Sequence, residues 1–580
     1  MNAVLPVETL VTDHLDLWTA ALKRKSTAGR GSSSKVELYG IKKLRELILE
    51  LAVRGLLVPQ DPNDEPASEQ LKRIAVEKAK LVEEGKIKKD KPLPPIAAGE
   101  APFAIPAGWT LTRLADVINV LNGRAYKKHE MLSEGTPILR VGNLFTSNEW
   151  YFSDLELEPE KYIDDGDLIY AWSASFGPFI WQGGKVIYHY HIWKMEFFSK
   201  ADVDKFYLRH YLQAISASIK ASGNGIAMIH MTKERMEKLV LPIPPIEEQH
   251  RIIAKVDELM ALCDQLEQET EASLGAHQTL VETLLSALTS AADHAQFASA
   301  WRRIAGHFDT LFKTEESIAQ LKQTILQLAV MGKLVPQDLN DEPASELLKK
   351  IAVEKARLVK EGKIKKEKPS LPIPEAEKPF DVPRGWMWIR LSILCELENG
   401  DRSKNYPNKS LLVDSGIPFV NAGHLQSGRI NASEMTFISE ERFNLLSGGK
   451  FSDGDILFCL RGSLGKSAIV EGYSRGAIAS SLVIVRLVGE SDRLYLHNYF
   501  DSPLSYKQIQ KYDNGTAQPN LSAADLGKFL IPLPPLAEQH RIVAKVDELM
   551  ALCDQLKSRL SDAQTTQLHL ADALVEQAIG

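Results

Sequence analysis

The sequence predicts an α+β protein in which two mixed α/β domains are joined by two long antiparallel helical regions that form a coiled coil. The first observation is internal duplication, because two segments of the 580-residue chain each occur twice. The second is a change of pattern. Helical spacing dominates the duplicated segments, whereas short β-type runs with glycine and proline turns fill the stretches between them. We expect a pseudo-two-fold arrangement built from permuted repeats.

The duplicated segments define the frame of the molecule. Residues 44–92 recur at 321–369 with 37 of 49 positions identical, and residues 241–266 recur at 531–556 with 21 of 26 identical. The offsets are 277 and 290, so the stretch between the segments is 13 residues longer in the second copy. Similarity falls away within these stretches. The chain therefore consists of two nearly identical frames, each of which carries a different insert.

The two ends of the chain also match parts of the internal duplication. The tail at 564–580 resembles the middle stretch at 276–292, and Trp18 lies upstream of the first frame much as Trp301 lies upstream of the second. The repeat unit is therefore permuted, with its start near the C-terminus and its continuation at the N-terminus. We expect the two ends to pair and to close a pseudo-two-fold molecule.

A long helix is predicted over about 246–290. Pro244 and Pro245 followed by acidic residues favour a helix start, and apolar residues then alternate at spacings of three and four, which is typical of a coiled-coil seam. At ~1.5 Å per residue this helix would be roughly 65 Å long. The two seam thiols are interpreted as core groups rather than reactive groups. The seam positions are Ile252, Val256, Leu259, Cys263 and Leu266 in the first copy and Ile542, Val546, Leu549, Cys553 and Leu556 in the second.

The other frame segment predicts two shorter helices, over about 36–54 and 67–84, each ended by a glycine. A basic, proline-rich linker follows at 85–95. The inserts combine strands with one helical stretch each, at 205–221 and at 494–512. The predicted strands are 117–121, 137–141, 167–172 and 185–190 in the first insert and 417–422, 455–460 and 481–488 in the second.

These patterns divide the chain into five parts. The N-terminal helical region with the first frame and its linker spans 1–97, and the first α/β domain spans 98–241. The central helical region with the second frame spans 242–374, and the second α/β domain spans 375–531. The C-terminal helix at 532–580 is expected to pair with the N-terminal region.

The sequence carries little that indicates catalysis. The nearest match to a phosphate-binding loop is GSLGKS at 462–467, but a Walker A loop needs a glycine at the position that Leu460 occupies. We find no nucleophile elbow, no zinc-protease motif, no clustered Cys/His spacing and no glycine-rich dinucleotide loop in the sequence. We therefore predict no catalytic residues and no metal site, and we interpret the chain as a binding and scaffolding protein.

Taken together, the motifs resemble a known family. They are ILQLAVMGKLVPQDLNDEPASELLKKI at 325–351, the tetrapeptides PAGW at 106–109 and PRGW at 383–386, GDILF at 454–458, and PLPPLAEQHRIVAKVDELMALCDQL at 532–556. These segments are similar to the specificity subunit of type I restriction-modification enzymes (HsdS). The resemblance covers nearly the whole chain, in both copies and in the expected order.

The resemblance implies two target recognition domains, each of which reads one half of a bipartite, asymmetric site in double-stranded DNA. The helices would set the nonspecific gap and dock two modification (methyltransferase) subunits, and two restriction (translocase and nuclease) subunits would complete the endonuclease. This chain would be a non-catalytic subunit without a cofactor. S-adenosylmethionine for adenine N6 methylation, and ATP and Mg for translocation and cleavage, would belong to the partner subunits.

Base reading requires side chains that reach base edges, such as Arg or Lys for guanine and Asn or Gln for adenine. Residues 98–240 contain 15 Lys and Arg against 17 Asp and Glu, and residues 375–530 contain 17 against 18, so we expect positive charge to be segregated onto one face. The DNA-binding candidates at turns and strand ends are Arg124, Lys127, Lys128, Arg140, Asn143, Trp172, Ser173 and Asn224 in the first insert and Arg402, Lys404, Asn421, His424, Arg461, Ser463, Lys466, Gln518 and Asn520 in the second.

Two other hypotheses are open from the residues alone. One is a protein-binding coiled-coil scaffold without direct base reading, and the other is an NTPase that uses residues 462–467. Four cysteines without a CxxC pair, no apolar run near ~18–20 residues and an acidic N-terminal stretch predict a cytoplasmic protein. The net charge of −7 argues against coating nucleic acid by bulk charge, but it is compatible with a local DNA-binding face.

Overall fold

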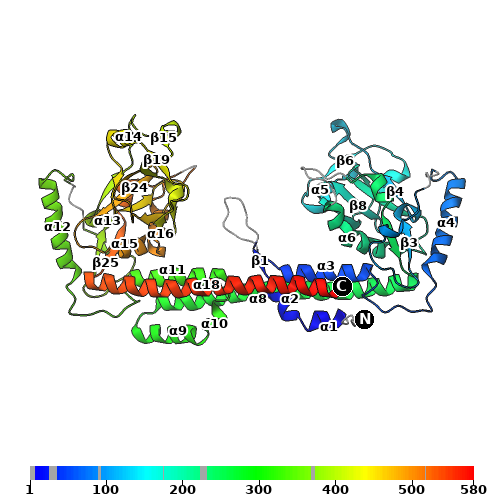
Figure 1. Cartoon of the computed structure of the whole chain (residues 1–580), viewed down its shortest axis with the longest axis horizontal. Coiled ribbons are helices and arrows are strands. Elements are labelled where there is room, and N and C mark those ends of the chain that lie inside the picture. The colour runs from blue at the N-terminus through cyan, green and yellow to red at the C-terminus, as the bar shows by residue number, and fades with distance from the viewer. Residues whose placement is uncertain are drawn as a thin grey trace. The chain divides into compact units, whose positions relative to one another are not determined.

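The computed structural model describes residues 7–24, 36–88, 93–173, 175–221, 231–366, 372–515 and 518–579. The chain divides into two compact units (Figure 1). Unit 1 comprises residues 1–273 and 563–580, and unit 2 comprises residues 274–562. The boundaries fall inside two long helices, α8 (Ile246–Ser290) and α18 (Leu536–Ile579). Within the described ranges, no helix is both long and apolar enough to cross a membrane.

The helical frame of unit 1 is built around a buried tryptophan. Trp18 is fully buried, and Gly40 permits the close approach because a Cβ there would lie 2.3 Å from the Trp18 carbonyl oxygen. The Tyr39 hydroxyl donates a hydrogen bond of 2.8 Å to Asp572, so the last turns of α18 pack on α3. The frame comprises α1 (Val7–Thr12), α2 (Leu15–Ala20), the paired strands β1 (Lys23–Arg24) and β2 (Val36–Glu37), α3 (Tyr39–Val53), the first part of α8 and the end of α18.

Helix α4 (Ala67–Glu83) and a mixed α/β domain complete unit 1 (Figure 1). Two four-stranded sheets have the orders β6-β5-β10-β7 and β4-β11-β8-β9, and β3 pairs with β12. The pair β5–β10 is parallel. The strands are β3 (Thr110–Arg113), β4 (Ile118–Asn122), β5 (Thr136–Leu139), β6 (Tyr151–Ser153), β7 (Tyr162–Ile163), β8 (Leu168–Ser173), β9 (Ser175–Ile180), β10 (Val186–Tyr188), β11 (Ile192–Phe197) and β12 (Val240–Ile243), and the helices are α5 (Val141–Phe145), α6 (Lys205–Ala221) and α7 (Lys233–Glu237).

The frame of unit 2 differs from that of unit 1 around its tryptophan. Trp301 is 42% exposed, although its neighbours Ala300 and Ile304 are buried. Both tryptophans lie upstream of their frames, as the sequence shows, but they pack differently, because Trp301 lies on the outer face of its helix. The frame comprises the rest of α8, α9 (His294–Gly306), α10 (Phe308–Leu311), α11 (Glu315–Val330), α12 (Ala344–Lys360) and the first part of α18.

The α/β domain of unit 2 repeats the sheets of the first domain with additions. Its large sheets have the orders β15-β19-β16-β23-β20 and β14-β24-β21-β22, β13 pairs with β25, and β17 pairs with β18. The pair β16–β23 is parallel, like β5–β10. The strands are β13 (Met387–Arg390), β14 (Cys395–Asn399), β15 (Leu412–Val413), β16 (Ile417–Val420), β17 (Leu425–Gln426), β18 (Arg429–Ile430), β19 (Thr436–Ile438), β20 (Lys450–Phe451), β21 (Ile456–Cys459), β22 (Ser467–Ile469), β23 (Gly476–Ile478), β24 (Leu482–Leu487) and β25 (Leu530–Leu533).

The helices of this domain correct one prediction. The single helix expected over 494–512 is two helices, α15 (Arg493–Phe500) and α16 (Pro503–Tyr512). The break falls before Pro503, which lacks a backbone N–H and starts α16 at its first turn, with the Ser502 hydroxyl accepting from the Ser505 N–H. The remaining helices are α13 (Leu391–Leu394), α14 (Glu440–Leu445) and α17 (Ala523–Leu526). The predicted helix over 205–221 and all seven predicted strands are confirmed within a few residues.

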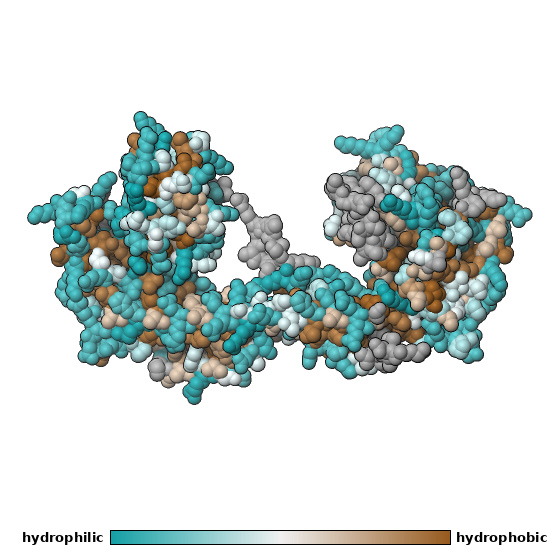
Figure 2. Space-filling view, in the orientation of Figure 1, coloured by the Kyte–Doolittle hydropathy of each residue, from teal (hydrophilic) through white to brown (hydrophobic). Residues whose placement is uncertain are grey.

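The predicted seam residues of α8 and α18 are mostly buried within the two units. Ile252, Val256 and Cys263 are 0% exposed, and Ile542 and Cys553 are 0% and 2% exposed. Leu259 and Val546 are also buried, whereas Leu266, Leu549 and Leu556 are partly buried against the same cores. Burial raises the pKa of the Cys263 thiol to about 11, so the interpretation of the seam cysteines as core groups is confirmed. By contrast, the visible outer face of the molecule is largely hydrophilic (Figure 2).

A Glu-Gln-His-Arg motif at the start of each long helix joins the α/β domain to its frame. We call this motif the box, and it spans residues 248–251 in unit 1 and 538–541 in unit 2. In unit 1, the Trp109 indole N–H donates to Glu248 Oε2 at 3.0 Å, and the Arg251 guanidinium donates to Asp64 Oδ2 at 2.6 Å. Gln249 accepts a 2.9 Å hydrogen bond from the backbone N–H of residue 204, which lies just before α6. The box therefore holds three separate chain segments at the first turns of α8.

Unit 2 repeats these contacts with its own residues. The Trp386 indole N–H donates to Glu538 Oε2 at 2.9 Å, and Arg541 donates to Asp341 Oδ2 at 2.6 Å. Gln539 accepts from the backbone N–H of residue 492 at 3.0 Å. The three motifs that recur in the sequence, PxGW, the NDEP turn and EQHR, therefore meet at one point in each unit.

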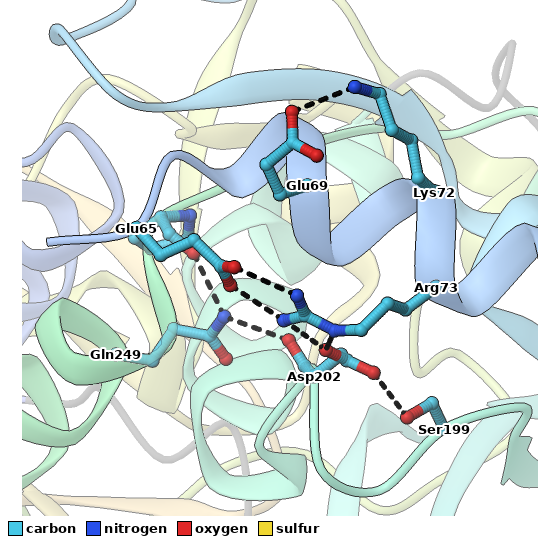
Figure 3. A network of polar contacts seen from close by, with 8 residues as sticks. Glu65, Glu69, Lys72, Arg73, Ser199, Asp202 and Gln249 are labelled. Atoms are coloured by element: carbon cyan, nitrogen blue, oxygen red, sulfur yellow. Dashed lines mark hydrogen bonds and ion pairs between the residues drawn. The ribbon is translucent and has the colours of Figure 1, made fainter.

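One contact beside the box is specific to unit 1 (Figure 3). Arg73 of α4 donates to Glu65 and, at 2.7 Å, to Asp202, whose other oxygen accepts from the Ser199 hydroxyl at 2.6 Å. In unit 2 the corresponding side chain is Lys350, which donates to Glu342 at 2.6 Å. A bidentate arginine can bridge two carboxylates, whereas a lysine is a point charge, so the outer helix is tied to the α/β domain differently in the two units.

The two boxes differ in how well the buried carboxylate is satisfied, and this difference yields a prediction. Burial raises the pKa of Glu248 while the Trp109 hydrogen bond opposes the rise, and Glu248 Oε1 has no partner among the described residues. Glu538 Oε1, by contrast, accepts from Gln337 at 3.2 Å. We expect Trp109→Phe to destabilise unit 1 by about 1–3 kcal/mol, because it removes the hydrogen bond that satisfies a buried carboxylate.

The matched variant Trp386→Phe should lower the free energy of unfolding of unit 2 by a smaller amount, because Glu538 keeps its hydrogen bond from Gln337. Hydrogen–deuterium exchange of the full chain reports both units separately, through peptides from α3 and α11. Equal loss of protection in the two variants would contradict this account of the box.

Candidate nucleic-acid interface

Two of the candidates in unit 1, Arg124 and Trp172, contact the turn between β10 and β11. The backbone of Arg124 pairs with this turn, since its N–H donates to the Tyr188 carbonyl at 3.2 Å and its carbonyl accepts from the Tyr190 N–H at 3.1 Å. The Trp172 indole N–H donates to the Tyr190 carbonyl at 2.9 Å, and Ser173 follows on the same strand. The structure therefore brings together residues that are separated by about 50 positions in the sequence.

The cations of this domain differ in how accessible they are. The Arg124 guanidinium is paired with Glu130 at 2.9 Å and lies over the Tyr126 ring, so its charge is already compensated. Lys127 and Lys128 are exposed on the following turn. Arg140 is exposed as well, with its guanidinium 5.2 Å from the centre of the Tyr151 ring. Arg140 and the two lysines are therefore the side chains best placed to contact phosphate.

Two candidates in unit 1 serve the fold, and one lies outside the described residues. Asn143 accepts from the Arg140 N–H at 3.1 Å and donates to the Glu149 carbonyl at 2.8 Å, so both ends of its amide are used at the start of α5. Trp172 stacks on Trp193 at 5.4 Å with an interplanar angle of 21°, as part of the domain core. We correct both residues to structural roles. Asn224 lies in the stretch 222–230, outside the described residues.

The candidates in unit 2 form a tighter group. The turn that joins β21 to β22 contains Arg461, Ser463 and Lys466, all of which are exposed. Arg461 pairs with Asn520 both through the backbone and through a 3.0 Å bond from its Nε to the Asn520 side-chain oxygen. Gln518 lies beside the same turn, because a Cβ on Gly462 would lie 3.5 Å from its side-chain nitrogen. Five predicted residues from two chain segments therefore share one surface.

Two glycines give the β21–β22 turn its shape. Gly462 has φ +80° and Gly465 has φ +83°, values that favour glycine. The Gly462 N–H donates to the Pro519 carbonyl at 3.1 Å, which fixes the turn against the segment that carries Gln518 and Asn520. The turn is thus a hairpin connection that presents Arg461, Ser463 and Lys466 to solvent.

A second group of candidates in unit 2 lies on the loop after β14. Arg402 and Lys404 are exposed, whereas the neighbouring Asp401 is buried. Asp401 accepts from the Ser403 N–H and the Ser447 N–H, each at 2.6 Å, and from the Ser447 hydroxyl at 2.7 Å. Burial opposes ionisation of this carboxyl, but these hydrogen bonds prevail and hold the pKa of Asp401 at about 2. The charged loop is therefore anchored by an ionised aspartate.

His424 is corrected from a DNA-binding candidate to a structural residue. It is 4% exposed, and its Nδ1 accepts from the Asn421 N–H at 3.1 Å while its Nε2 lies 2.9 Å from the Glu434 carbonyl. Both ring nitrogens are engaged inside the protein, so neither can reach a base. The Asn421 side-chain oxygen accepts from the Gly423 N–H at 2.8 Å, which leaves its amide nitrogen for other contacts.

Sequence reasoning missed residues of two kinds. The Glu-Gln-His-Arg boxes were seen only as repeated motifs, since their partners lie far away in the sequence. The ring-bearing turn at His189, Tyr190 and His191 was hidden in a β-type run, which ends in the structure at Tyr188. The signal that could have revealed this turn is the difference between the inserts, since residues 189–191 read HYH where residues 479–481 of the second copy read ASS.

Over the described residues, no group of three or more His, Cys, Asp and Glu side chains is placed to hold a metal ion. The geometry offers paired turns with cationic and amide side chains on two domains of one fold, which is an arrangement suited to binding an extended polyanion such as DNA.

Comparison with known proteins identifies the family. The family model described as "Type I restriction modification DNA specificity domain" matches the chain twice, at residues 106–276 and 383–563. The chain therefore belongs to the family of type I restriction-modification specificity subunits, as the motifs suggested. This membership does not favour the hypothesis of a protein-binding scaffold.

The curated relatives cover the chain from end to end. The chain is similar to the type I restriction enzyme EcoAI specificity subunit of Escherichia coli, with 42% identity across 99% of this chain and 100% of the relative. The EcoEI specificity subunit of Escherichia coli is 40% identical, again over 99% and 100% of the two chains. A crystal structure of the HsdS subunit from Thermoanaerobacter tengcongensis aligns with 83% of this chain and 98% of that chain, with 19% identity and a TM-score of 0.39.

The buried aspartate of the charged loop yields a prediction about stability and pH. Asp401→Asn should destabilise unit 2 by about 1–3 kcal/mol at neutral pH, because an amide cannot accept from donors on both sides. The pKa of Asp401 in the folded protein, about 2, lies below its ordinary value of 3.8. Its stabilising contribution is therefore present in full above about pH 4, and it is lost as the pH falls toward 2.

The measurement is the melting temperature of the full chain between pH 7 and pH 2.5, for the wild type and for Asp401→Asn. Asp414→Asn, at an exposed position of the same domain, is the control and should change little. A difference between wild type and Asp401→Asn that stayed constant down to pH 2.5 would rule out this role for the carboxylate.

Proposed function

We propose that this chain is the DNA sequence-specificity subunit of a type I restriction-modification complex, and that each α/β domain reads one half of a bipartite, asymmetric site. The observation that carries the proposal is the contrast between the two domains. They share a common four-strand order in each large sheet and the same box that joins them to the frame, but they have different side chains on equivalent surface turns. Two copies of one fold with unlike reading surfaces suit two unlike half-sites.

We further propose that the recognition domains span residues 98–241 and 375–531, and that α8 and α18 pair along their apolar seams as an antiparallel, pseudo-two-fold coiled coil. Buried seam residues in both units support this pairing. In this proposal the helices set the gap between the half-sites and dock two modification subunits. The copied exposed faces of α4 and α12 would give the two partners equivalent surfaces.

We also propose that the chain itself is non-catalytic and carries no cofactor. Adenine N6 methylation with S-adenosylmethionine would then belong to the modification subunits, and ATP- and Mg-dependent cleavage would belong to restriction subunits where these are present. The side chains that contact DNA would position it mainly through phosphate, and a few would read base edges. A cytoplasmic location is proposed as well, and four free, buried cysteines agree with it.

Domain exchange tests the central claim. Replacement of residues 98–241 by the corresponding domain of a relative with a different recognition sequence should change one half of the methylated site and leave the other half unchanged. The reason is that the duplicated box joins each domain to its frame through the same side-chain contacts in both units. Mapping methylated adenines across the host genome gives both half-sites at once. A change in both halves would refute the assignment of one domain to each.

An insertion into the long helices tests whether they set the gap between the half-sites. Four residues added to α8 and four to α18, near the boundary between the units, would lengthen each helix by ~6 Å and keep the seam nearly in phase. At ~3.4 Å per base pair, the gap between the half-sites should grow by about one to two base pairs. The same methylation map reports the gap. An unchanged gap in a variant that still methylates DNA would show that the helices do not set the gap.

A further inference from the structure

The turn between β10 and β11 carries three ring side chains in succession. The ring centres of His189 and Tyr190 are 4.3 Å apart, those of Tyr190 and His191 are 4.0 Å apart, and those of His189 and His191 are 4.8 Å apart. Tyr190 is 40% exposed, and both histidines are partly exposed. Three packed rings at the surface of a tight turn form a compact patch of aromatic and imidazole groups.

The backbone of this turn is held from three sides. The His189 N–H donates to the Leu139 carbonyl at 2.9 Å, and the Tyr190 N–H donates to the Arg124 carbonyl at 3.1 Å. From a third strand, the Trp172 indole N–H donates to the Tyr190 carbonyl at 2.9 Å. A turn that is fixed by β5, β8 and the end of β4 presents its side chains in one geometry, as a reading element requires.

The second domain contains the same turn without the rings. The N–H of Ala479 donates to the Val420 carbonyl at 2.8 Å, as His189 does to Leu139, and the N–H of Leu460 donates to the Ser481 carbonyl at 2.8 Å. In each domain a glycine at the end of the neighbouring strand lets that strand approach the turn. A Cβ on Gly123 would lie 2.4 Å from a turn carbonyl oxygen, and a Cβ on Gly400 would lie 2.6 Å from one.

The second domain shows that the backbone of this turn does not depend on the ring side chains. His189, Tyr190 and His191 occupy the backbone positions of Ala479, Ser480 and Ser481, so the turn forms with or without rings. The second domain instead places its charged and amide side chains on the β21–β22 turn, where Arg461 stands at the position of Ser173. The two domains therefore carry their distinctive side chains on adjacent but different turns.

We infer that the His189–Tyr190–His191 turn is the base-contacting element of the first recognition domain, and that it contacts base edges in a groove of duplex DNA. This inference deepens the proposed function and rests on it. An imidazole N–H can donate to a purine N7 or to guanine O6, and an aromatic ring edge can contact the thymine methyl group. Arg140 lies close enough for its charge to act on His189, and Lys127 and Lys128 are exposed elsewhere on the same domain, so these side chains supply cations for the phosphates.

The protonation state of the His189 imidazole agrees with this role. Burial, the neighbouring His191 and the charge of Arg140 lower the pKa of His189 to about 4, so its ring is neutral at physiological pH. A neutral imidazole offers one donor and one acceptor, which allows it to discriminate between base edges. A charged ring would be attracted to any phosphate.

The test converts the turn of the first domain to that of the second. The full chain with His189→Ala, Tyr190→Ser and His191→Ser is produced in its host with its own modification subunits, and methylated adenines are mapped across the genome. We expect at least one base pair of a single half-site to lose discrimination about tenfold, while the other half-site and the gap stay unchanged. Glu156→Gln, an exposed change in the same domain outside the turn, is the control and should leave both half-sites unaltered.

Melting temperatures establish that the variant chains are folded. If the triple variant melts early, the single variant Tyr190→Ser, which removes one exposed ring, carries the test with the same expected loss at one base pair. A folded variant that methylates the original half-site with its original discrimination would overturn the inference. The proposed function would survive that result if exchange of residues 98–241 still redirects one half-site, and it would fail with the inference if the exchange redirects neither.

Discussion

A carboxylate buried at the start of each long helix is the interaction on which the placement of each α/β domain depends. Removing a carboxylate from water costs several kcal/mol unless hydrogen bonds replace its hydration. Glu248 and Glu538 are each 1% exposed, and each accepts from the indole of a tryptophan at the entry to the α/β domain. Because the carboxylate cannot move away from that indole without losing its hydrogen bond, the entry strand, the frame turn and the helix start are fixed together. This junction therefore fixes where the exposed side chains of each α/β domain lie relative to the frame of the same unit.

The duplication shows how one backbone can carry two kinds of surface chemistry. The turns at the sheet ends are held by bonds between backbone groups, or by an indole that donates to a backbone carbonyl. Such bonds do not depend on the side chains of the turn itself, so these side chains are able to change without loss of the fold. The first domain has rings at one turn, and the second has Arg461 with its amide neighbours at the next. In the frames, by contrast, the side chains of the box are themselves the contacts, and they are the same in both copies.

Much of the fold could be predicted because it rests on local patterns. The predicted helix over 246–290 is α8, those over 36–54 and 67–84 are α3 and α4, and the strands follow their β-type runs. The break between α15 and α16 was missed because the hydrophobic spacing continues across Pro503, although its missing N–H favours a helix start there. The candidate site was predicted less well. Polarity alone could not distinguish Arg461, which is exposed on a turn, from His424, whose nitrogens are both bonded inside the domain.

The sequence by itself determined the family, the two frames, the long helices and the places where the two inserts diverge, because repeats, periodicity and turn residues are properties of neighbouring positions. Only the tertiary structure decided which distant residues meet. It joined Trp109 to Glu248, brought Arg461 to Asn520, and set Trp172 beneath the turn at Tyr190. The physical reason is that hydrogen bonds and burial act over a few ångströms in space, whereas these partners are separated by up to 139 positions along the chain.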